Sequence, residues 1–213
     1  MPTCSRTLSR FAIAVVLLTT IAIAAQKVER LALQAGGLSE PIRHAVEEKG
    51  YRVALDNGST ADFWFAKQLL ASEKTVPGAL CPDLEPGAFI AIVTLHRDLS
   101  DYRGQTIRPG TYSLRYELLP QDGNHLGVAP NPDFLLAIPV AEETNPIQPL
   151  VLKKVEEMSS KVTGSHPAVI ALDSTGEPGT LTKTDQGVVF SVAVPTAAGS
   201  EKIGICLTCS ASQ

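Results

Sequence analysis

Two cysteines near the end of the sequence, Cys206 and Cys209, have a spacing that occurs in thiol redox pairs and in metal sites. Redox chemistry calls for a helix that starts at the pair and lowers a thiol pKa, but only four residues follow Cys209. A zinc site needs two more ligands, and haem attachment needs a histidine where Ser210 stands. We predict a structural disulfide or two unreactive thiols, with metal capture and redox chemistry as the alternatives.

With Cys81 there are three cysteines beyond the N-terminal segment, so the pattern predicts one bridge and one spare thiol. A bridge from Cys81 to Cys206 or Cys209 would close a loop of about 125 residues and stabilise the fold by roughly 4 to 5 kcal/mol. A bridge between Cys206 and Cys209 would constrain the chain far less. The sequence leaves the pairing open.

Polar residues between the predicted strands form the second candidate site. Tyr102 and Arg103 lie in one connection, and Asp122, His125 and Asp133 lie in or after the next. If both connections meet at one end of a sheet, the cluster could hold a sugar, a carboxylate or a metal. In the structural alternative, Asp122 belongs to a turn, Arg103 and Asp133 form a salt bridge, and His125 donates to a backbone carbonyl.

Two further groups of residues carry weaker signals. His96 and the carboxylate of Asp98 lie two residues apart at the end of a predicted strand and are a possible metal pair. His44 and His166 are predicted to be solvated, and the four histidines share no ligand-like spacing. Trp64, the only tryptophan, is predicted to lie in the core; if it faced outward, it could stack on a sugar.

Several well-defined signatures are missing from the sequence. It has no Gly-x-Ser-x-Gly nucleophile turn, no His-Glu-x-x-His metal motif, no Gly-x-x-x-x-Gly-Lys phosphate loop and no Gly-x-Gly-x-x-Gly dinucleotide motif. No cofactor and no catalytic residue is therefore predicted, although catalytic triads are recognised by geometry and not by spacing.

The first 25 residues have the pattern of an export signal. Arg6 and Arg10 precede an apolar run of about 15 residues, which is short of the roughly 20 that a spanning helix requires. The run ends in Ala22-Ile23-Ala24, so cleavage after Ala24 is expected, with retention as an anchor as the alternative. These features predict a periplasmic or secreted protein with no membrane span after cleavage.

Cleavage at that position changes the charge balance. Residues 1–24 contain two of the 18 basic residues and none of the 22 acidic ones, so the remaining 189 residues have a net charge of −6. The basic residues are scattered. Nucleic acids and anionic membranes attract clustered lysine and arginine, so neither is expected as the main partner.

The central stretch, residues 88–140, has the alternation and turn signals of antiparallel strands. Residues 88–96 are apolar and rich in β-branched side chains, a Pro-Gly turn follows, and residues 111–118 alternate polar and apolar side chains. Residues 133–140 read as the next strand. Other strands are predicted at residues 27–34, 51–55, 61–67, 168–172, 180–184, 187–194 and 202–208.

Two helices are expected beside these strands. The first begins at a Ser39 cap and ends near Lys49, and the second covers residues 150–162 and ends at Gly164. The second has an apolar stripe of Val151, Val155, Met158 and Val162. Many short strands without a regular β-α-β order predict a mainly β fold, a β-sandwich or jelly-roll-like single domain over residues 25–213 with two peripheral helices.

The Pro-Gly-Thr-Tyr-Ser-Leu segment at residues 109–114, with residues 101–105, 122–127 and 133–136 around it, resembles a group of exported bacterial β-sandwich proteins of unknown function. The resemblance covers about residues 40–140. It implies a sandwich fold and export, and it implies no activity and no catalytic residue.

The sequence favours an exported, non-catalytic module that binds an envelope ligand or a protein through Tyr102, Arg103, Asp122, His125 and Asp133. The alternative is a metal-dependent enzyme or a metal carrier that uses His125 or His96 with nearby carboxylates.

Overall fold

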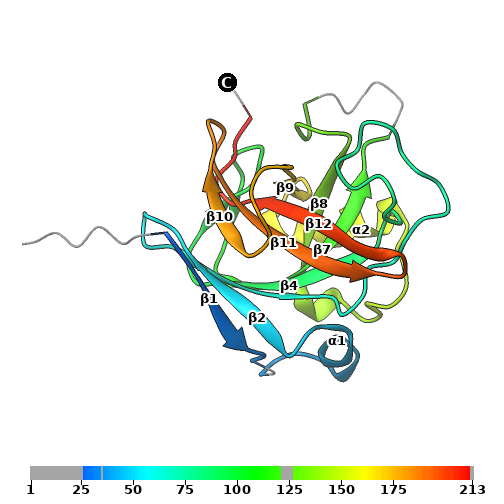
Figure 1. Cartoon of the computed structure of the whole chain (residues 1–213), viewed down its shortest axis with the longest axis horizontal. Helices are drawn as coiled ribbons and strands as arrows, with labels where there is room; N and C mark the ends of the chain where they lie inside the picture. Colours follow the sequence, from blue (N-terminus) through cyan, green and yellow to red (C-terminus); the bar gives the residue numbers. More distant parts are fainter. Residues whose placement is uncertain (1–25, 35, 121–126, 212–213) are drawn as a thin grey trace, which may run out of the picture.

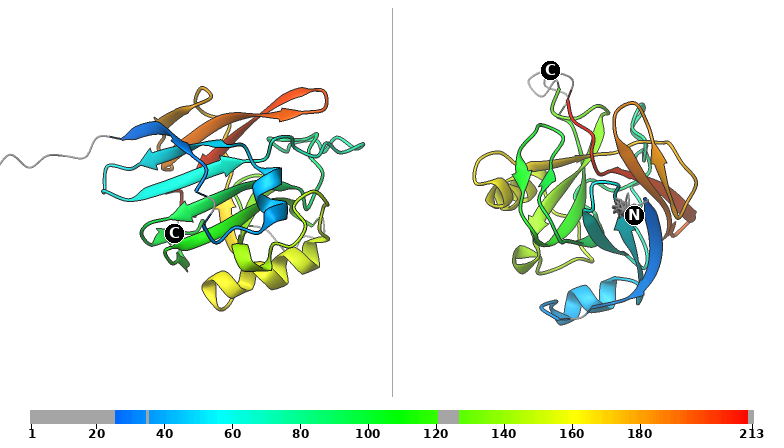
Figure 2. Two further views of the ribbon diagram at one scale, coloured as in Figure 1. Left: turned by 90° about the horizontal axis from the view of Figure 1, so that it is seen from below. Right: turned by 90° about the vertical axis from the view of Figure 1, so that its left-hand side faces the viewer.

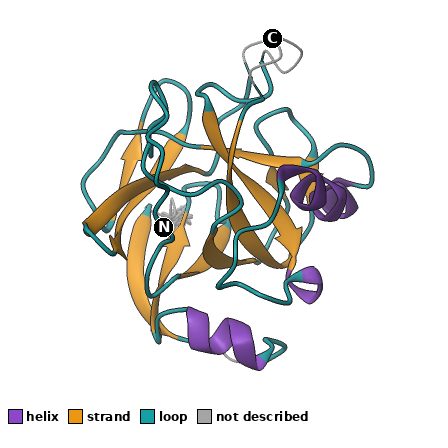
Figure 3. Cartoon of the chain, turned by 90° about the vertical axis from the view of Figure 1, so that its right-hand side faces the viewer, coloured by secondary structure: helices purple, strands orange, loops and turns teal. Residues whose placement is uncertain are grey.

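The computed structural model describes residues 26–34, 36–120 and 127–211. A three-stranded sheet packs on one face of a seven-stranded sheet, and the longer helix lies on the opposite face (Figures 1 and 2). The shorter helix lies at the periphery (Figure 3). All strand pairs in these sheets are antiparallel. The predicted mainly β sandwich with two peripheral helices is confirmed.

The strands of the larger sheet follow the order β1-β2-β3-β4-β7-β8-β9. They are β1 (Lys27–Ala32), β2 (Lys49–Ala54), β3 (Thr60–Phe65), β4 (Phe89–Leu95), β7 (Gly110–Leu118), β8 (Asp133–Pro139) and β9 (Ala168–Ala171). The smaller sheet contains β10 (Thr180–Lys183), β11 (Val188–Thr196) and β12 (Gly199–Cys206). A two-stranded ribbon, β5 (Leu99–Ser100) and β6 (Thr106–Ile107), lies between β4 and β7 in the chain. The helices are α1 (Glu40–Ala45), η1 (Val140–Glu142) and α2 (Leu152–Thr163).

An aromatic cluster joins the two sheets. The ring of Phe190 in β11 lies 5.3 Å from the ring of Tyr51 and 5.4 Å from that of Phe63, measured between centroids. Phe65 completes the cluster at 6.1 Å from Phe190. Because side chains on a strand alternate between faces, Phe63 and Phe65 point into the sandwich and Trp64 points to the other face, where it is also buried. Trp64 is therefore a core residue, as predicted, and not an exposed platform.

The two sheets also meet at their edges. Leu172, just after β9, forms a bridge with Ile205 of β12, and the N–H of Asp173 donates to the carbonyl of Gly204. At the other side, β1 contacts β10. The last strand, β12, pairs with β11 along its length.

Strand β7 is buried on both faces. Tyr112, Leu114 and Tyr116 belong to the main core, so the alternate residues Ser113 and Arg115, with Glu117 beyond them, point to the opposite face. Those three polar residues are also buried. The alternation of polar and apolar residues suggested a strand with one face in water. In the structure, that face is covered by the segment that follows β8 and by α2.

Arg115 holds that covering segment in place. Its Nε and Nη2 donate to the two carboxylate oxygens of Glu143 at 2.9 and 2.8 Å, and both residues are fully buried. Nη1 donates to the carbonyls of Gly87 and Gln148, and Nη2 also donates to that of Asn145. All five N–H donors thus find acceptors, which is what a buried guanidinium requires.

Gly87 allows the chain to cross at this point. Its φ of +78° lies in the left-handed region, and a Cβ there would collide with the carbonyl of Leu150. The N–H of Leu150 donates to the carbonyl of Gly87. The segment that leads into α2 is therefore hydrogen-bonded to the residue that lies just before β4. The glycine therefore determines where the helix starts.

The helices differ from the predicted ones at their ends. α2 ends at Gly164, as expected, in the left-handed conformation, and its buried face contains Val155 and Met158. Val151 was predicted to be part of that face but is 74% exposed, because it precedes the first turn. Within the described residues, no helix is long and apolar enough to cross a membrane.

The prediction that α1 reaches Lys49 was wrong, because the helix ends at Ala45. Val46 forms a β-bridge with Ala66, and the N–H of Glu47 donates to the carbonyl of Phe65. Pairing with the end of β3 thus replaces the last helical turns. The predicted strands 51–55 and 61–67 correspond to β2 and β3, which Asn57 and Gly58 join in a turn with Gly58 at φ +76°.

We expect Glu143→Ala to lower the free energy of unfolding by about 3 to 5 kcal/mol, because it leaves a buried guanidinium without its counter-ion. Urea denaturation measures this. The neighbouring Glu142 forms an exposed ion pair with Lys161, so Glu142→Ala is the matched control and should cost less than about 1 kcal/mol. Equal losses in the two variants would contradict the role assigned to Arg115.

Candidate functional site

The loop that carries Tyr102 and Arg103 is held by a buried carboxylate. Asp101 Oδ1 accepts hydrogen bonds from the backbone N–H groups of Arg103 and Gln105, at 3.0 and 2.7 Å. Oδ2 accepts from the Gln105 side chain and from the N–H of Val169 in β9. Asp101 therefore fixes the loop against the edge of the larger sheet.

Tyr102 and Arg103 have different surroundings. The backbone of Tyr102 bonds to Val169 and Ala211, and its ring packs partly against the hydrophobic cluster that includes the C-terminal disulfide. Arg103 donates from Nη2 to the carbonyl of Pro167 and otherwise lines a groove. Its Nε is buried and has no acceptor among the residues that the structure describes. Of the two, only Arg103 is placed to meet a ligand.

Asp133 is a structural residue on the inner side of the fold. It is fully buried at the start of β8, and its carboxylate accepts hydrogen bonds from the N–H groups of Leu80 and Cys81 at 3.0 and 2.8 Å. The hydroxyl of Tyr116 lies 3.3 Å away. The salt bridge expected between Arg103 and Asp133 is not formed, because Asp133 faces the long connection before β4.

Asp122 and His125 belong to residues 121–126, which lie outside the described part of the chain. Pro120, the last described residue before this segment, lines the same groove as Arg103. Their predicted approach to Arg103 stays a prediction.

The groove has a volume of about 480 Å³ and lies between α2 and the strands beneath it. Its apolar surface comes from Leu119, Pro120, Val128, Phe134, Leu136, Pro167 and Val169. The helix contributes Lys153, Glu156, Glu157 and Ser160, and the opposite wall contributes Arg103, Ser165 and His166. An apolar floor with a few polar groups at its walls is typical of small-molecule sites.

Glu117 lies near this groove, on the face of β7 under α2. The residue is 1% exposed, and Oε1 has no hydrogen-bond partner in the part of the chain that the structure describes. Burial raises its pKa to about 8; the charge of Glu156 adds to this, while Arg115 and the N–H of Leu118 oppose it. The carboxyl group therefore keeps its proton at neutral pH and can donate a hydrogen bond.

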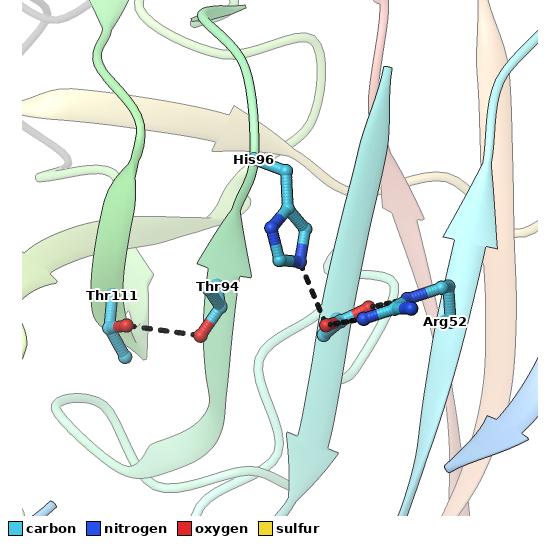
Figure 4. Close-up of polar contacts among 5 residues, drawn as sticks. Arg52, Thr94, His96 and Thr111 are labelled. Carbon is cyan, nitrogen blue, oxygen red and sulfur yellow. Dashed lines mark hydrogen bonds and ion pairs between the residues drawn. The ribbon is translucent and has the colours of Figure 1, made fainter. Parts of the chain in front are cut away.

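His96 takes part in a polar row across the outer face of the sheet. Its Nε2 lies 2.8 Å from Asp62 Oδ2, and Arg52 binds both oxygens of the same carboxylate at 2.7 Å (Figure 4). Beside them, the hydroxyls of Thr94 and Thr111 lie 3.0 Å apart. Desolvation raises the pKa of Asp62, but the hydrogen bonds from Arg52 and His96 outweigh it and keep that pKa low.

The predicted metal pair of His96 with Asp98 is thus replaced by a pairing of His96 with Asp62, on the neighbouring strand. Among the described residues, no group of three histidine, cysteine or acidic side chains is arranged to hold a metal. His44 is exposed and lies 3.5 Å from Glu40 on the same helix. His166 is also exposed, but it lines the groove.

Cys206 and Cys209 form a disulfide, and Cys81 is a buried free thiol. This is the predicted count of one bridge and one spare thiol, in the pairing that constrains the chain least. Burial, with the nearby charges of Glu201 and Asp133, raises the pKa of the Cys81 thiol. A neutral, enclosed thiol is a poor nucleophile and a poor metal ligand.

The groove residues on α2, and Glu117 on β7 near the groove, were missed by the sequence analysis. Glu117 occupies a polar position of an alternating strand, which usually faces water. The signal that could have revealed it is the apolar stripe of α2, because Val155 and Met158 must pack on the outer face of some strand.

Comparison with known proteins identified no relative of this chain: no family model, curated protein or solved structure matches it.

The buried Glu117 should make stability depend on pH. The folded chain keeps the proton up to about pH 8, whereas the unfolded chain releases it near pH 4.5. Stability contributed by this group is complete below pH 4.5 and is lost, by about 1.4 kcal/mol per pH unit, until about pH 8. Glu117→Gln should therefore gain stability relative to the original chain across that window in urea unfolding.

The exposed Glu157 on α2 provides the control for this experiment. Glu157→Gln should follow the pH profile of the unsubstituted protein. A Glu117→Gln profile parallel to both would show that Glu117 titrates normally.

Proposed function

We propose that this chain is an exported binding module, and that the groove between α2 and strands β8 and β9 accommodates a small amphipathic anion. The observation that carries the proposal is the unpaired guanidinium of Arg103 at the wall of an apolar groove. Its one hydrogen bond within the described residues goes to a carbonyl oxygen, and it forms no ion pair with any of them.

The contrast with Arg115 supports this assignment. Arg115 has five bonded donors and a carboxylate partner, as a structural arginine does. Arg103 has a carbonyl to orient it and leaves Nε and Nη1 without acceptors in the described part of the chain. The guanidinium therefore keeps its positive charge and its Nη1 donors for a ligand, and such a group binds a carboxylate, sulfonate or phosphate through charge-assisted hydrogen bonds.

The other charges determine how the ligand lies. Glu156 and Glu157 on α2 repel an anionic group, so that group belongs at the Arg103 wall, with Ser165 and His166 beside it. The apolar part of the ligand then covers Phe134 and Leu136 on the floor. Each buried methylene contributes about 0.8 kcal/mol.

Arg103→Gln should weaken the binding of 1-anilinonaphthalene-8-sulfonate about tenfold, because the sulfonate loses a charge-assisted hydrogen bond. Fluorescence titration measures the affinity of this probe, whose rings and sulfonate resemble the proposed ligand. Arg108 lies in the same connection between β4 and β7, is exposed and does not line the groove. Arg108→Gln is therefore the matched control. The proposal fails if the two variants bind the probe equally well.

Export is supported by the basic and apolar pattern of residues 1–24. When the full sequence is expressed in a bacterium, we expect the chain outside the cytoplasm to begin at Ala25, as intact-mass measurement would show. Recovery of the unprocessed chain in the cytoplasm would contradict this.

A further inference from the structure

Helix α2 begins without a cap. Its N-cap residue, Val151, has no side chain that can accept a hydrogen bond, and the first turn contains no acidic residue. The N–H groups of Leu152 and Lys153 belong to the first turn, where no helical carbonyl is available to them. These donors, the helix dipole and the two lysines of the first turn all favour an anion at this end.

A pocket of about 490 Å³ lies at the same end of the helix. Its walls are mainly apolar and come from Pro86, Leu118, Leu119, Pro120, Pro149, Leu150, Val151 and Leu152. The polar side chains that line it are those of Glu85 and Glu117. An apolar enclosure beside free backbone donors suits a ligand with one charged group and a compact hydrocarbon part.

Glu117 is the second, independent indication of a ligand. It lines this pocket, it is 1% exposed, and Oε1 has no partner among the described residues. A buried polar atom without a partner destabilises the fold, so a ligand that bonds to this carboxyl group offsets part of that cost. Glu117 and Leu152, in the first turn of the helix, line the same pocket.

We infer that this pocket binds the carboxylate of a small apolar monocarboxylic acid, held by the first-turn N–H groups of α2 and by the protonated carboxyl of Glu117. The hydrocarbon part packs against the prolines and leucines of the walls. This site goes beyond the proposed function: it shares Leu119 and Pro120 with the Arg103 groove, but Arg103 does not line it.

Binding depends on the proton of Glu117. The charged groups that act on Glu117 or line the same pocket are Glu156 on α2, Arg115 on β7 and Glu85 on the segment before β4. Burial and Glu156 keep the proton in place up to about pH 8. Above that pH, Glu117 becomes an anion and repels the ligand carboxylate, so affinity falls.

The test uses sodium benzoate as the probe. Ligand-observed NMR gives the dissociation constant at pH 6.5 and pH 9.5, and amide shifts at pH 6.5 locate the site. We expect the largest shifts at Leu152 and Lys153 and an affinity about tenfold weaker at the higher pH, because one charge-assisted hydrogen bond is lost. Glu117→Gln, whose amide donates at every pH, should bind with nearly the same affinity at both.

Two control variants separate this site from other effects. Arg108→Gln, at an exposed residue that lines neither pocket, should keep the affinity, its pH dependence and the shifts at Leu152 and Lys153. The inference is overturned if benzoate leaves the amides of Leu152 and Lys153 unshifted, or if Glu117→Gln loses affinity between pH 6.5 and 9.5 as the original chain does. If Arg103→Gln no longer binds benzoate, the probe binds in the Arg103 groove, and the second site is rejected.

Discussion

The buried ion pair of Arg115 and Glu143 is the interaction on which the outer layer of this fold depends. Two buried charges are expensive to desolvate, and only complete pairing compensates for them. Arg115 meets this condition with a bidentate contact to Glu143 and three backbone carbonyls from two segments. The segment that follows η1 therefore has one low-energy path over the sheet, and it carries the start of α2 to a defined place.

Both candidate sites depend on that placement. The Arg103 groove lies along α2 and the second pocket lies at its first turn, so each has the helix as one wall. The opposite walls belong to the strands and to a loop that Asp101 ties to β9. Asp101 and Arg115, whose hydrogen bonds are all made, thus hold the helix, the loop and the strands in position. The polar groups without acceptors lie at the groove and the pocket between these elements.

The strands of the two main sheets were predictable because each carries its own signal: turn residues mark the ends, and alternation marks the faces. The two-residue strands β5 and β6 were not predicted. Even the β10–β11 hairpin and the final strand lie close to their predicted positions. The α1 boundary was not predictable, since Val46 and Glu47 pair with a strand that follows them in the chain. The role of Asp133 was equally hidden, because its partners lie 52 and 53 residues away.

The residues of the candidate sites were even harder to predict from the sequence. Arg115, Glu117 and Arg103 are ordinary polar residues in the sequence, and only their surroundings separate them. Arg115 is buried with every donor bonded, which accounts for it structurally. Glu117 is buried with an oxygen that has no partner, and Arg103 keeps donors beside an apolar floor. An unpaired polar group lowers the stability of the fold, so folding alone does not explain why Glu117 and Arg103 are placed in this way. A ligand that bonds to these groups would offset that loss of stability.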